Sequence, residues 1–258
     1  MNILFIGDIM GRAGRNVIKS HLKEIQSEYQ IDFTIANAEN ASGYAGLAKS
    51  SYDELMQAGI DFFTTGNHVW AQKEIFDYIE RCDNLLRPAN YPSPCPGKGY
   101  GIVRVNKIRL GIINLSGTVF MDALDNPFSV FDTLYASISN ACDFLLIDFH
   151  AEATSEKIAF AHHACGRAQA VLGTHTHVQT ADERIIDGMT AAITDVGMTG
   201  PADGVIGIDK DIILKSFKTK RPVRFELAQG HRQFNAVRLQ VDSSFRCTKI
   251  ERIYRTYP

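Results

Sequence analysis

The sequence lacks the features that mark membrane proteins, secreted proteins and proteins that bind nucleic acid. It has no apolar run near the about 18 residues of a membrane-spanning helix, and its first residues, MNILFIG, lack the cationic start and long apolar segment of a secretory signal. Its 27 Lys and Arg residues balance 29 Asp and Glu residues, for a net charge of −2. We therefore expect a cytoplasmic protein with no membrane association and no stable binding to nucleic acid.

Cysteine is also scarce, with five residues in a chain of 258 and no C-x-x-C pair. An odd number excludes a complete set of intrachain disulfides and favours reduced thiols. Internal repeats and low-complexity tracts are absent, and the Pro-rich stretch 87–99 is more typical of a shaped surface loop than of a linker. The sequence therefore predicts a single domain over residues 1–258. It leaves open whether the protein is a homo-oligomer.

What is present is an alternation of short apolar runs with helical patterns. The predicted strands are 2–7, 32–36, 61–65, 101–105, 110–114, 143–149, 170–174 and 190–194. The predicted helices are 15–29, 51–57, 72–81, 126–140 and 155–165. This order favours an α/β fold with helices on both faces of a sheet. From about Arg221, the segments VRFEL, QFNAVRLQV and CTKIERIY predict antiparallel strands that complete the sheet or cover its edge.

Polar side chains follow five of these strands at their carboxyl ends, where open α/β sheets bind ligands. The residues are Asp8, Glu39, Asn40, Asn67, His68, His150, His175 and His177. Carboxylate, amide and imidazole groups suit divalent ions such as Mn, Fe or Zn. If the strands are neighbours in one sheet, these groups exceed the needs of one ion, and two ions about 3.5–4 Å apart are the economical interpretation. Each residue could instead cap a helix or turn, but five such coincidences in succession argue against that.

The stretch GTHTH at 173–177 places two of the histidines two positions apart. In an extended segment their side chains would point to the same side, about 6.6 Å apart at their origins. That geometry suits two ligands of one site, although such a pair is also common as polar capping of a loop.

Seven motifs together carry a family resemblance. They are GDIMGRAGR (7–15), NAENASGYAG (37–46), GNHVW (66–70), RPANYP (87–92), DFHAEATSEK (148–157), GTHTHVQTAD (173–182) and ITDVGMTGP (193–201). In this order they resemble the YmdB-like branch of the calcineurin-like metallophosphoesterases, whereas the last fifty or so residues carry no motif. The resemblance implies a four-layer α/β/β/α sandwich and a binuclear centre of divalent or mixed-valence ions. Iron is the expected metal, with manganese as the alternative.

The resemblance also assigns roles to individual residues. Asp8, Glu39, Asn40 and His177 would hold one ion, and Glu39, Asn67, His150 and His175 the other, with Glu39 bridging. His68 would be the general acid. The wider superfamily begins with Asp-x-His, but GDIM places Met10 at the histidine position, and Asn40 can fill the missing place. The resemblance gives no residue for binding the rest of the substrate.

These residues predict a hydrolase that acts on small phosphodiesters. Paired cations activate water and neutralise charge on phosphoryl oxygens, and an imidazole with an ordinary pKa near 6.5 can protonate the leaving oxygen. By resemblance, cyclic nucleotides are the leading substrates, with 2',3'-cyclic nucleotides first and 3',5'-cyclic nucleotides second.

Three other functions stay open on the sequence alone. The same centre could hydrolyse phosphomonoesters or another phosphodiester, such as an RNA end. The chain could be a regulatory module that binds a nucleotide or a partner with incidental turnover. A one-iron oxygenase needs only two histidines and a carboxylate, which leaves Asn40 and Asn67 unexplained. Two further residues have equal alternatives: Trp70 stacks on a base or packs in the core, and Asp195 supports a histidine ligand or caps a turn.

Overall fold

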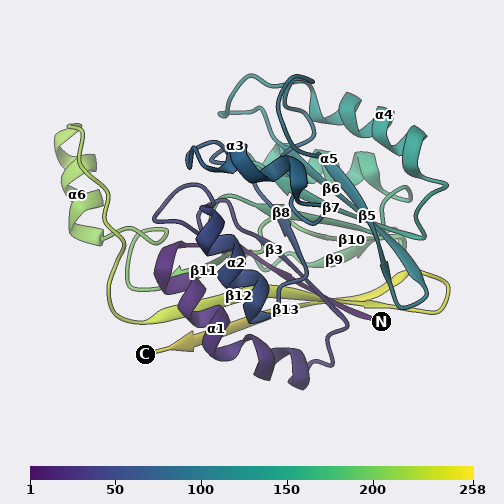
Figure 1. The fold of residues 1–258 in the computed structure, drawn as a ribbon, viewed down its shortest axis with the longest axis horizontal. Helices are drawn as coiled ribbons and strands as arrows, with labels where there is room; N and C mark the ends of the chain where they lie inside the picture. Colours follow the sequence, from purple (N-terminus) through teal and green to yellow (C-terminus); the bar gives the residue numbers. More distant parts are fainter.

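The computed structural model describes residues 1–258 and contains two β-sheets (Figure 1). The first sheet consists of β1 (Asn2–Ile6), β2 (Asp8–Ile9), β3 (Phe33–Asn37), β4 (Phe62–Thr64), β11 (Met198–Pro201), β12 (Arg232–Val241) and β13 (Cys247–Tyr257). The second sheet runs in the order β5 (Tyr100–Val105), β6 (Ile108–Ser116), β7 (Phe144–His150), β8 (Ala170–Thr174), β10 (Thr190–Ile193) and β9 (Arg184–Ile186).

The helices lie outside the two sheets, and all but the last pack on their outer faces. They are α1 (Gly11–Glu28), α2 (Lys49–Ala58), α3 (Ile75–Tyr78) with a 3-10 turn at Ile79–Arg81, α4 (Pro127–Ile138), α5 (Thr154–Ala164) and α6 (Lys210–Thr219). Helices α1 and α2 pack on the first sheet, and α4 and α5 pack on the second (Figure 1). Helix α6 projects from the body of the molecule (Figure 1). No helix is both long and apolar enough to cross a bilayer.

Three hydrophobic clusters separate four layers, because successive side chains of a strand point to opposite faces. In β1, Ile3 and Phe5 lie in the cluster between the sheets, whereas Leu4 and Ile6 lie in the cluster beneath α1. The pattern repeats in β7, where Leu146 faces the first sheet and its neighbours face α4 and α5. The α/β/β/α sandwich is therefore confirmed, with two hydrophobic clusters of similar size, one between the sheets and one beneath α1 and α2.

The last part of the chain completes the first sheet. Strand β12 is paired along one edge with β13 and along the other with β11 and β1, all antiparallel. QFNAVRLQV and CTKIERIY lie in these two strands, as predicted. VRFEL does not form a strand: only Leu227 makes an isolated bridge, to Ile208. Both edges of β12 are occupied, so VRFEL has no ladder to join there.

Several short elements were missed by the sequence pattern, and one was predicted too long. Strands β2, β9 and β11 have two to four residues, too few for a visible alternation. Helix α6 was not predicted, although the Asp209 side chain caps it by accepting hydrogen bonds from the backbone of Asp211 and Ile212. The helix predicted at 72–81 is only a four-residue helix followed by the 3-10 turn.

The strands that carry the candidate ligands belong to two sheets. The expectation that they are neighbours in one sheet is therefore wrong. Strands β1, β3 and β4 are parallel neighbours in the first sheet, and β7 and β8 are parallel neighbours in the second. The carboxyl ends of these two sets meet at one end of the sandwich, which brings the candidate residues together from both sheets.

Candidate metal centre

All eight sequence-predicted residues meet in one cluster. Two groups of possible ligand atoms, each within 4.8 Å of one another, share Glu39: one adds Asp8 and His177, and the other adds His150 and His175. The remaining three residues join by hydrogen-bonding contacts: Asn40 to Glu39 and His177, Asn67 to His150, and His68 to Asn40.

Asp8 supplies the clearest sign that the cluster suits a cation. Its Oδ2 accepts a hydrogen bond from the backbone N–H of His175 at 3.1 Å, whereas its fully buried Oδ1 has no hydrogen-bond partner. Burial raises the pKa of this carboxyl, although the nearby His177 and His150 oppose the rise. A buried carboxylate oxygen without a donor is costly, and a bound cation would satisfy it.

Glu39 lies between the two groups with one carboxylate oxygen on each side. Its Oε2 lies 3.2 Å from Nε2 of His150, and its Oε1 accepts a hydrogen bond at 2.9 Å from Nδ2 of Asn40, which is 3.1 Å from Nε2 of His177. Burial opposes ionisation of Glu39, but His150 and His68 outweigh it and hold the pKa of this carboxyl well below its ordinary value. Glu39 is thus a charged group that belongs to both groups of possible ligands.

Three of the four histidines of the cluster present one ring nitrogen inward and anchor the other. Fixing the outer nitrogen in this way is the usual arrangement of metal-binding histidines. The outer contacts are Nδ1 of His150 to Oγ1 of Thr174 at 2.9 Å, Nε2 of His175 to Oε2 of Glu152 at 3.1 Å, and Nδ1 of His177 to the carbonyl of Ile206 at 3.0 Å.

The inward nitrogen of His150 faces other acceptors. Its Nε2 lies 2.9 Å from Oδ1 of Asn67 and 3.0 Å from Nδ1 of His175. Burial opposes protonation of His150, but Glu39 and Asp8 raise its pKa to about 9; burial and His150 lower the pKa of His175 to about 3. Asn67, His175 and Glu39 therefore direct lone pairs at one positively charged group, an arrangement that also suits a metal cation.

Asn40 is oriented differently from the expected ligand. Its amide nitrogen faces Glu39 and His177, while its Oδ1 lies 2.9 Å from Nδ1 of His68. In this orientation Asn40 connects the acid candidate to the cluster. A rotation of the amide by about 180° would exchange its oxygen and nitrogen and offer oxygen to the first group instead.

A buried polar network beneath the cluster joins the two sheets. Asp148 of β7 accepts hydrogen bonds from Thr174 at 2.7 Å, from Asn37 of β3 at 2.9 Å and from Thr64 of β4. Burial raises the pKa of Asp148 to about 6. Because Thr174 gives its only hydrogen to Asp148, it accepts from Nδ1 of His150, which leaves Nε2 to face the cluster.

The loop through GTHTH is not extended, contrary to expectation. His175 and His177 have φ values of +102° and +65°, in a region that residues other than glycine rarely adopt. Strained backbone of this kind is typical of functional sites. The preceding Gly173 is needed because a Cβ there would lie 1.8 Å from the carbonyl oxygen of Thr194.

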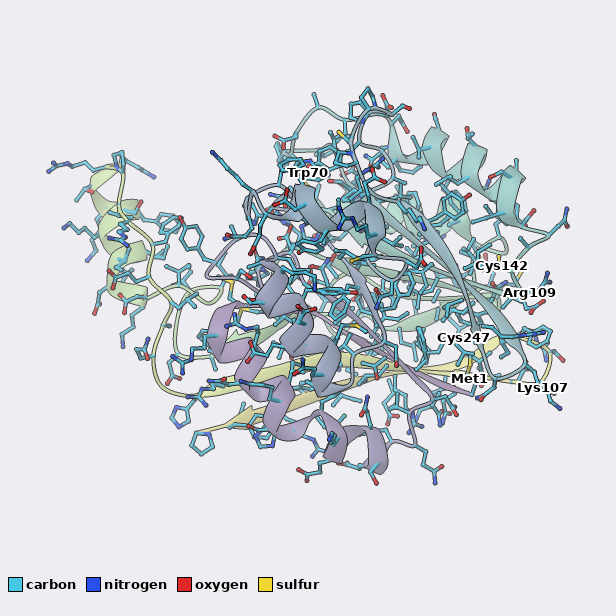
Figure 2. All side chains as sticks on the ribbon, viewed as in Figure 1. Met1, Trp70, Lys107, Arg109, Cys142 and Cys247 are labelled. Carbon is cyan, nitrogen blue, oxygen red and sulfur yellow. The ribbon has the colours of Figure 1, made fainter.

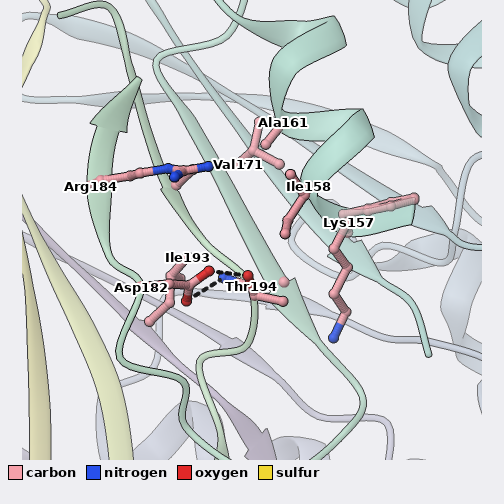
Figure 3. A pocket seen from close by; sticks show the side chains of 11 residues that line it. Lys157, Ile158, Ala161, Val171, Asp182, Arg184, Ile193 and Thr194 are labelled. Atoms are coloured by element: carbon pink, nitrogen blue, oxygen red, sulfur yellow. Dashed lines mark hydrogen bonds between the residues drawn. The ribbon is translucent and has the colours of Figure 1, made fainter. Parts of the chain in front are cut away.

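Asp195 holds this loop in place. Its Oδ2 accepts the N–H and O–H of Thr176 at 2.9 and 2.8 Å, and its Oδ1 accepts the N–H of Gly197 at 2.8 Å. Nζ of Lys157, a residue of α5, donates a hydrogen bond to Oδ2 of Asp195 at 2.7 Å. Figure 3 shows Lys157 and the hydrogen-bonded pair of Thr194 and Asp182 around one small pocket. Asp195 therefore binds the residue between the two histidines and contacts neither ring.

An open cavity of about 440 Å³ lies over the cluster. His68 faces it with 42% of its side chain exposed, against 1% for Glu39. A hydrogen bond with Glu39 raises the pKa of His68, although burial opposes the rise. Met10 lines the cavity from an apolar cluster with Met198 and Ile208, as expected for a residue that is not a ligand.

Other lining residues were not identified from the sequence. Tyr44 and Glu152 lie inside quoted motifs, so their proximity to ligands was a usable signal. Phe225 lies in VRFEL and gave no signal, because that segment was predicted to be a strand. Trp70 stacks on Phe76 of α3, with ring centroids 5.2 Å apart, so it packs beside this helix and does not line the cavity (Figure 2).

Comparisons with known proteins find relatives that match this chain over nearly its full length. A 2',3'-cyclic-nucleotide 2'-phosphodiesterase of Bacillus subtilis (strain 168) is 49% identical over 254 residues, covering 98% of this chain and 96% of that protein. A solved structure of a novel phosphatase from Mycoplasma pneumoniae has a TM-score of 0.94 at 37% identity, covering 99% of this chain and 93% of that one. A hypothetical protein from Thermus thermophilus has a TM-score of 0.95 at 41% identity, with both chains fully covered.

The resemblance seen in the seven motifs is thereby confirmed. The family model described as YmdB-like protein matches residues 4–253, which includes every residue of the cluster, the whole of β12 and the first seven residues of β13. This chain belongs to the YmdB-like protein family.

Proposed function

We propose that the protein is a metal-dependent phosphodiesterase that hydrolyses 2',3'-cyclic nucleotides at a binuclear centre. The observation that carries the proposal is the pair of ligand groups that share Glu39 at the base of an open cavity. The 49% identity to a 2',3'-cyclic-nucleotide 2'-phosphodiesterase supports the choice of substrate. 3',5'-Cyclic nucleotides are a second and slower class in this proposal.

The donor set fits two cations on chemical grounds. The unpartnered Oδ1 of Asp8 and the inward nitrogens of three anchored histidines offer oxygen and imidazole ligands, which suit iron, manganese or zinc. In the proposed assignment, Asp8, Glu39 and His177 hold one ion, with Asn40 if its amide rotates. Glu39, Asn67, His150 and His175 hold the other. Iron is the proposed metal, and manganese is the alternative.

In this proposal, different residues have different roles in hydrolysis. Bound cations supply an activated water and neutralise charge on the phosphoryl oxygens. His68, the exposed member of the cluster, donates a proton to the leaving ribose oxygen, which is O2' if the bond cleaved is the one that the name of the Bacillus subtilis relative indicates. The raised pKa of His68 keeps more of this imidazole protonated near neutral pH. Glu39 and Asn40 hold the ring through its Nδ1, which leaves Nε2 for the transfer.

A regulatory module that only binds a nucleotide would not require this arrangement. Binding could use one cation or none, and it has no need for a protonatable side chain oriented by Glu39 and exposed to the cavity. The cluster therefore favours turnover over binding alone.

The test is a substrate comparison with the purified protein loaded with Fe²⁺ or Mn²⁺. The substrates are adenosine 2',3'-cyclic phosphate, adenosine 3',5'-cyclic phosphate, a linear dinucleotide and 4-nitrophenyl phosphate, with products separated by chromatography. We expect the highest kcat/KM for the 2',3'-cyclic substrate and nucleoside 3'-phosphate as its product. Absence of turnover with every metal, together with nucleotide binding, would contradict the proposal and favour the regulatory module.

A further inference from the structure

The cavity over the cluster has two unlike walls. One wall is the polar cluster itself, and the other is apolar, with Tyr44, Phe225 and Ile206 as its outer members. These three side chains are 50%, 41% and 51% exposed, so they are not part of a packed core. Scattered exposed apolar residues are normal on protein surfaces, but a group of them beside a polar reaction site is typical of a ligand contact.

The two aromatic rings are arranged edge to face. The centroids of Tyr44 and Phe225 are 6.2 Å apart, with an interplanar angle of 85°. Tyr44 comes from the loop after β3, four positions beyond Asn40, and Phe225 comes from the segment between β11 and β12 that also carries α6 (Figure 1). The two rings therefore meet nearly at right angles, and both remain substantially exposed beside the cavity.

The backbone brings the two segments together closely. At Gly11, a Cβ would lie 2.4 Å from the carbonyl oxygen of Gly43 and 2.3 Å from Cδ1 of Leu227. Gly11, whose φ is +56°, therefore lets the neighbours of Tyr44 and Phe225 approach each other. The contact is built into the fold at a position that only glycine fits.

The apolar wall is also tied to the reaction site. The carbonyl of Ile206 accepts the hydrogen bond from Nδ1 of His177, whose Nε2 lies 3.1 Å from Nδ2 of Asn40. The same residue thus orients a candidate ligand with its backbone and lines the cavity with its side chain. A substrate whose phosphate lies at the cluster would extend the rest of its structure toward this wall.

We propose that Tyr44 and Phe225 form a nucleobase subsite in which the base of the substrate stacks on an aromatic ring. The proposal rests on the function proposed above and adds the means by which the cavity recognises the nucleoside. The volume of about 440 Å³ lies in the range of small-ligand pockets, roughly 300–1,000 Å³. Stacking on aromatic side chains tolerates every base, because each base has a π-face. The subsite therefore selects nucleotides over other phosphodiesters but discriminates weakly among bases.

The experiment compares two cyclic phosphodiesters that share a five-membered phosphate ring and differ in the base. Adenosine 2',3'-cyclic phosphate carries one, and glycerol 1,2-cyclic phosphate does not. In Phe225→Leu and Tyr44→Leu, we expect KM for the adenosine substrate to rise about tenfold with little change in kcat, which is the scale of a lost base–aromatic stack. Hydrolysis of the glycerol substrate should be unchanged, and Tyr44→Phe, which keeps the ring, should resemble the unaltered protein.

Phe217→Leu is the matched control. Phe217 is an exposed aromatic residue of α6, 66% exposed, on the same segment as Phe225 but outside the cavity. It should have no effect on either substrate. Equal losses on the two substrates in Phe225→Leu and Tyr44→Leu would overturn the subsite, as would the absence of any loss.

A binding measurement separates failure of the subsite from failure of the proposed function. Calorimetry compares adenosine 3'-monophosphate with glycerol 2-phosphate on the protein and on Phe225→Leu. A preference for the nucleotide that Phe225→Leu abolishes supports the subsite even if neither cyclic substrate is hydrolysed, in which case only the proposed function fails. Equal affinities for both ligands, with hydrolysis intact, overturn the subsite and leave the proposed function standing.

Discussion

Nζ of Lys157 lies 2.7 Å from Oδ2 of Asp195, and the two side chains are 3% and 0% exposed. This buried ion pair joins α5 to the loop that carries His175 and His177, because the same carboxylate oxygen accepts both hydrogen bonds from Thr176. The strained conformation of the loop is therefore supported from outside the cluster of candidate ligands, by the Asp195 carboxylate, whose only cationic partner in hydrogen-bond range is Lys157.

The pair predicts an unequal effect of removing one charge or both. Lys157→Met should lower the free energy of unfolding by about 3–5 kcal/mol, because it leaves the Asp195 carboxylate buried without its counter-charge. The double variant Lys157→Met with Asp195→Asn should recover part of the lost free energy of unfolding. Urea denaturation of the metal-free protein measures this free energy for the single and the double variant. Lys98→Met, which breaks an exposed pair with Asp83, is the control and should leave the free energy of unfolding nearly unchanged, because solvent screens the pair. A single variant as stable as the double variant would contradict this account.

The metal content is the second prediction. We expect about two divalent ions per chain after loading, because two ligand groups share Glu39, and we expect loss of hydrolysis after exhaustive chelation, with recovery on adding Fe²⁺ or Mn²⁺. Elemental analysis against protein concentration gives the stoichiometry. One ion per chain with full activity would rule out the binuclear centre.

Much of the fold was readable from the sequence because its strands are apolar runs with clear ends. Strands β3, β7 and β8 match the predicted segments to within one residue, because each is a short, mostly apolar run that is buried along its whole length. The assignment of strands to two sheets was not readable from periodicity, because Ile3 and Leu4 look alike in sequence although they face different layers. It came instead from the family resemblance.

The candidate ligands were found because each follows an apolar strand, where a polar residue is conspicuous. Their supporting residues were harder to find. Ile206 acts through its backbone carbonyl, which any residue could supply, and Thr174 acts through one hydroxyl that donates to Asp148 and accepts from His150. Phe225 lies on a segment without regular structure, so no period indicates which way its ring points.

Glu39 and Asp8 should behave differently when each loses its charge. Glu39→Gln should weaken both metal sites, because Glu39 belongs to both ligand groups, whereas Asp8→Asn should chiefly weaken one. For Glu39→Gln we expect a loss in affinity larger than the roughly 10–100-fold typical of an outer hydrogen-bonding partner. Calorimetric titration with Mn²⁺ measures the affinity of each of the two sites. Normal affinity for two ions in Glu39→Gln would show that Glu39 is not the bridge.

The last prediction separates an acid from a ligand at His68. If its imidazole protonates the leaving oxygen, His68→Ala should keep its metals and slow the hydrolysis of cyclic nucleotides by roughly 10²–10⁴, the usual range for general acid catalysis. Bis-(4-nitrophenyl) phosphate has a leaving group that needs no proton, so its hydrolysis should fall much less. The ratio of the two losses is the diagnostic quantity, because a disturbed Asn67 next to His68 would slow both substrates. Equal losses with full metal content would make His68 a phosphate-positioning residue. Equal losses with one ion missing would make it a ligand, which its 2.9 Å contact to Asn40 and 42% exposure argue against.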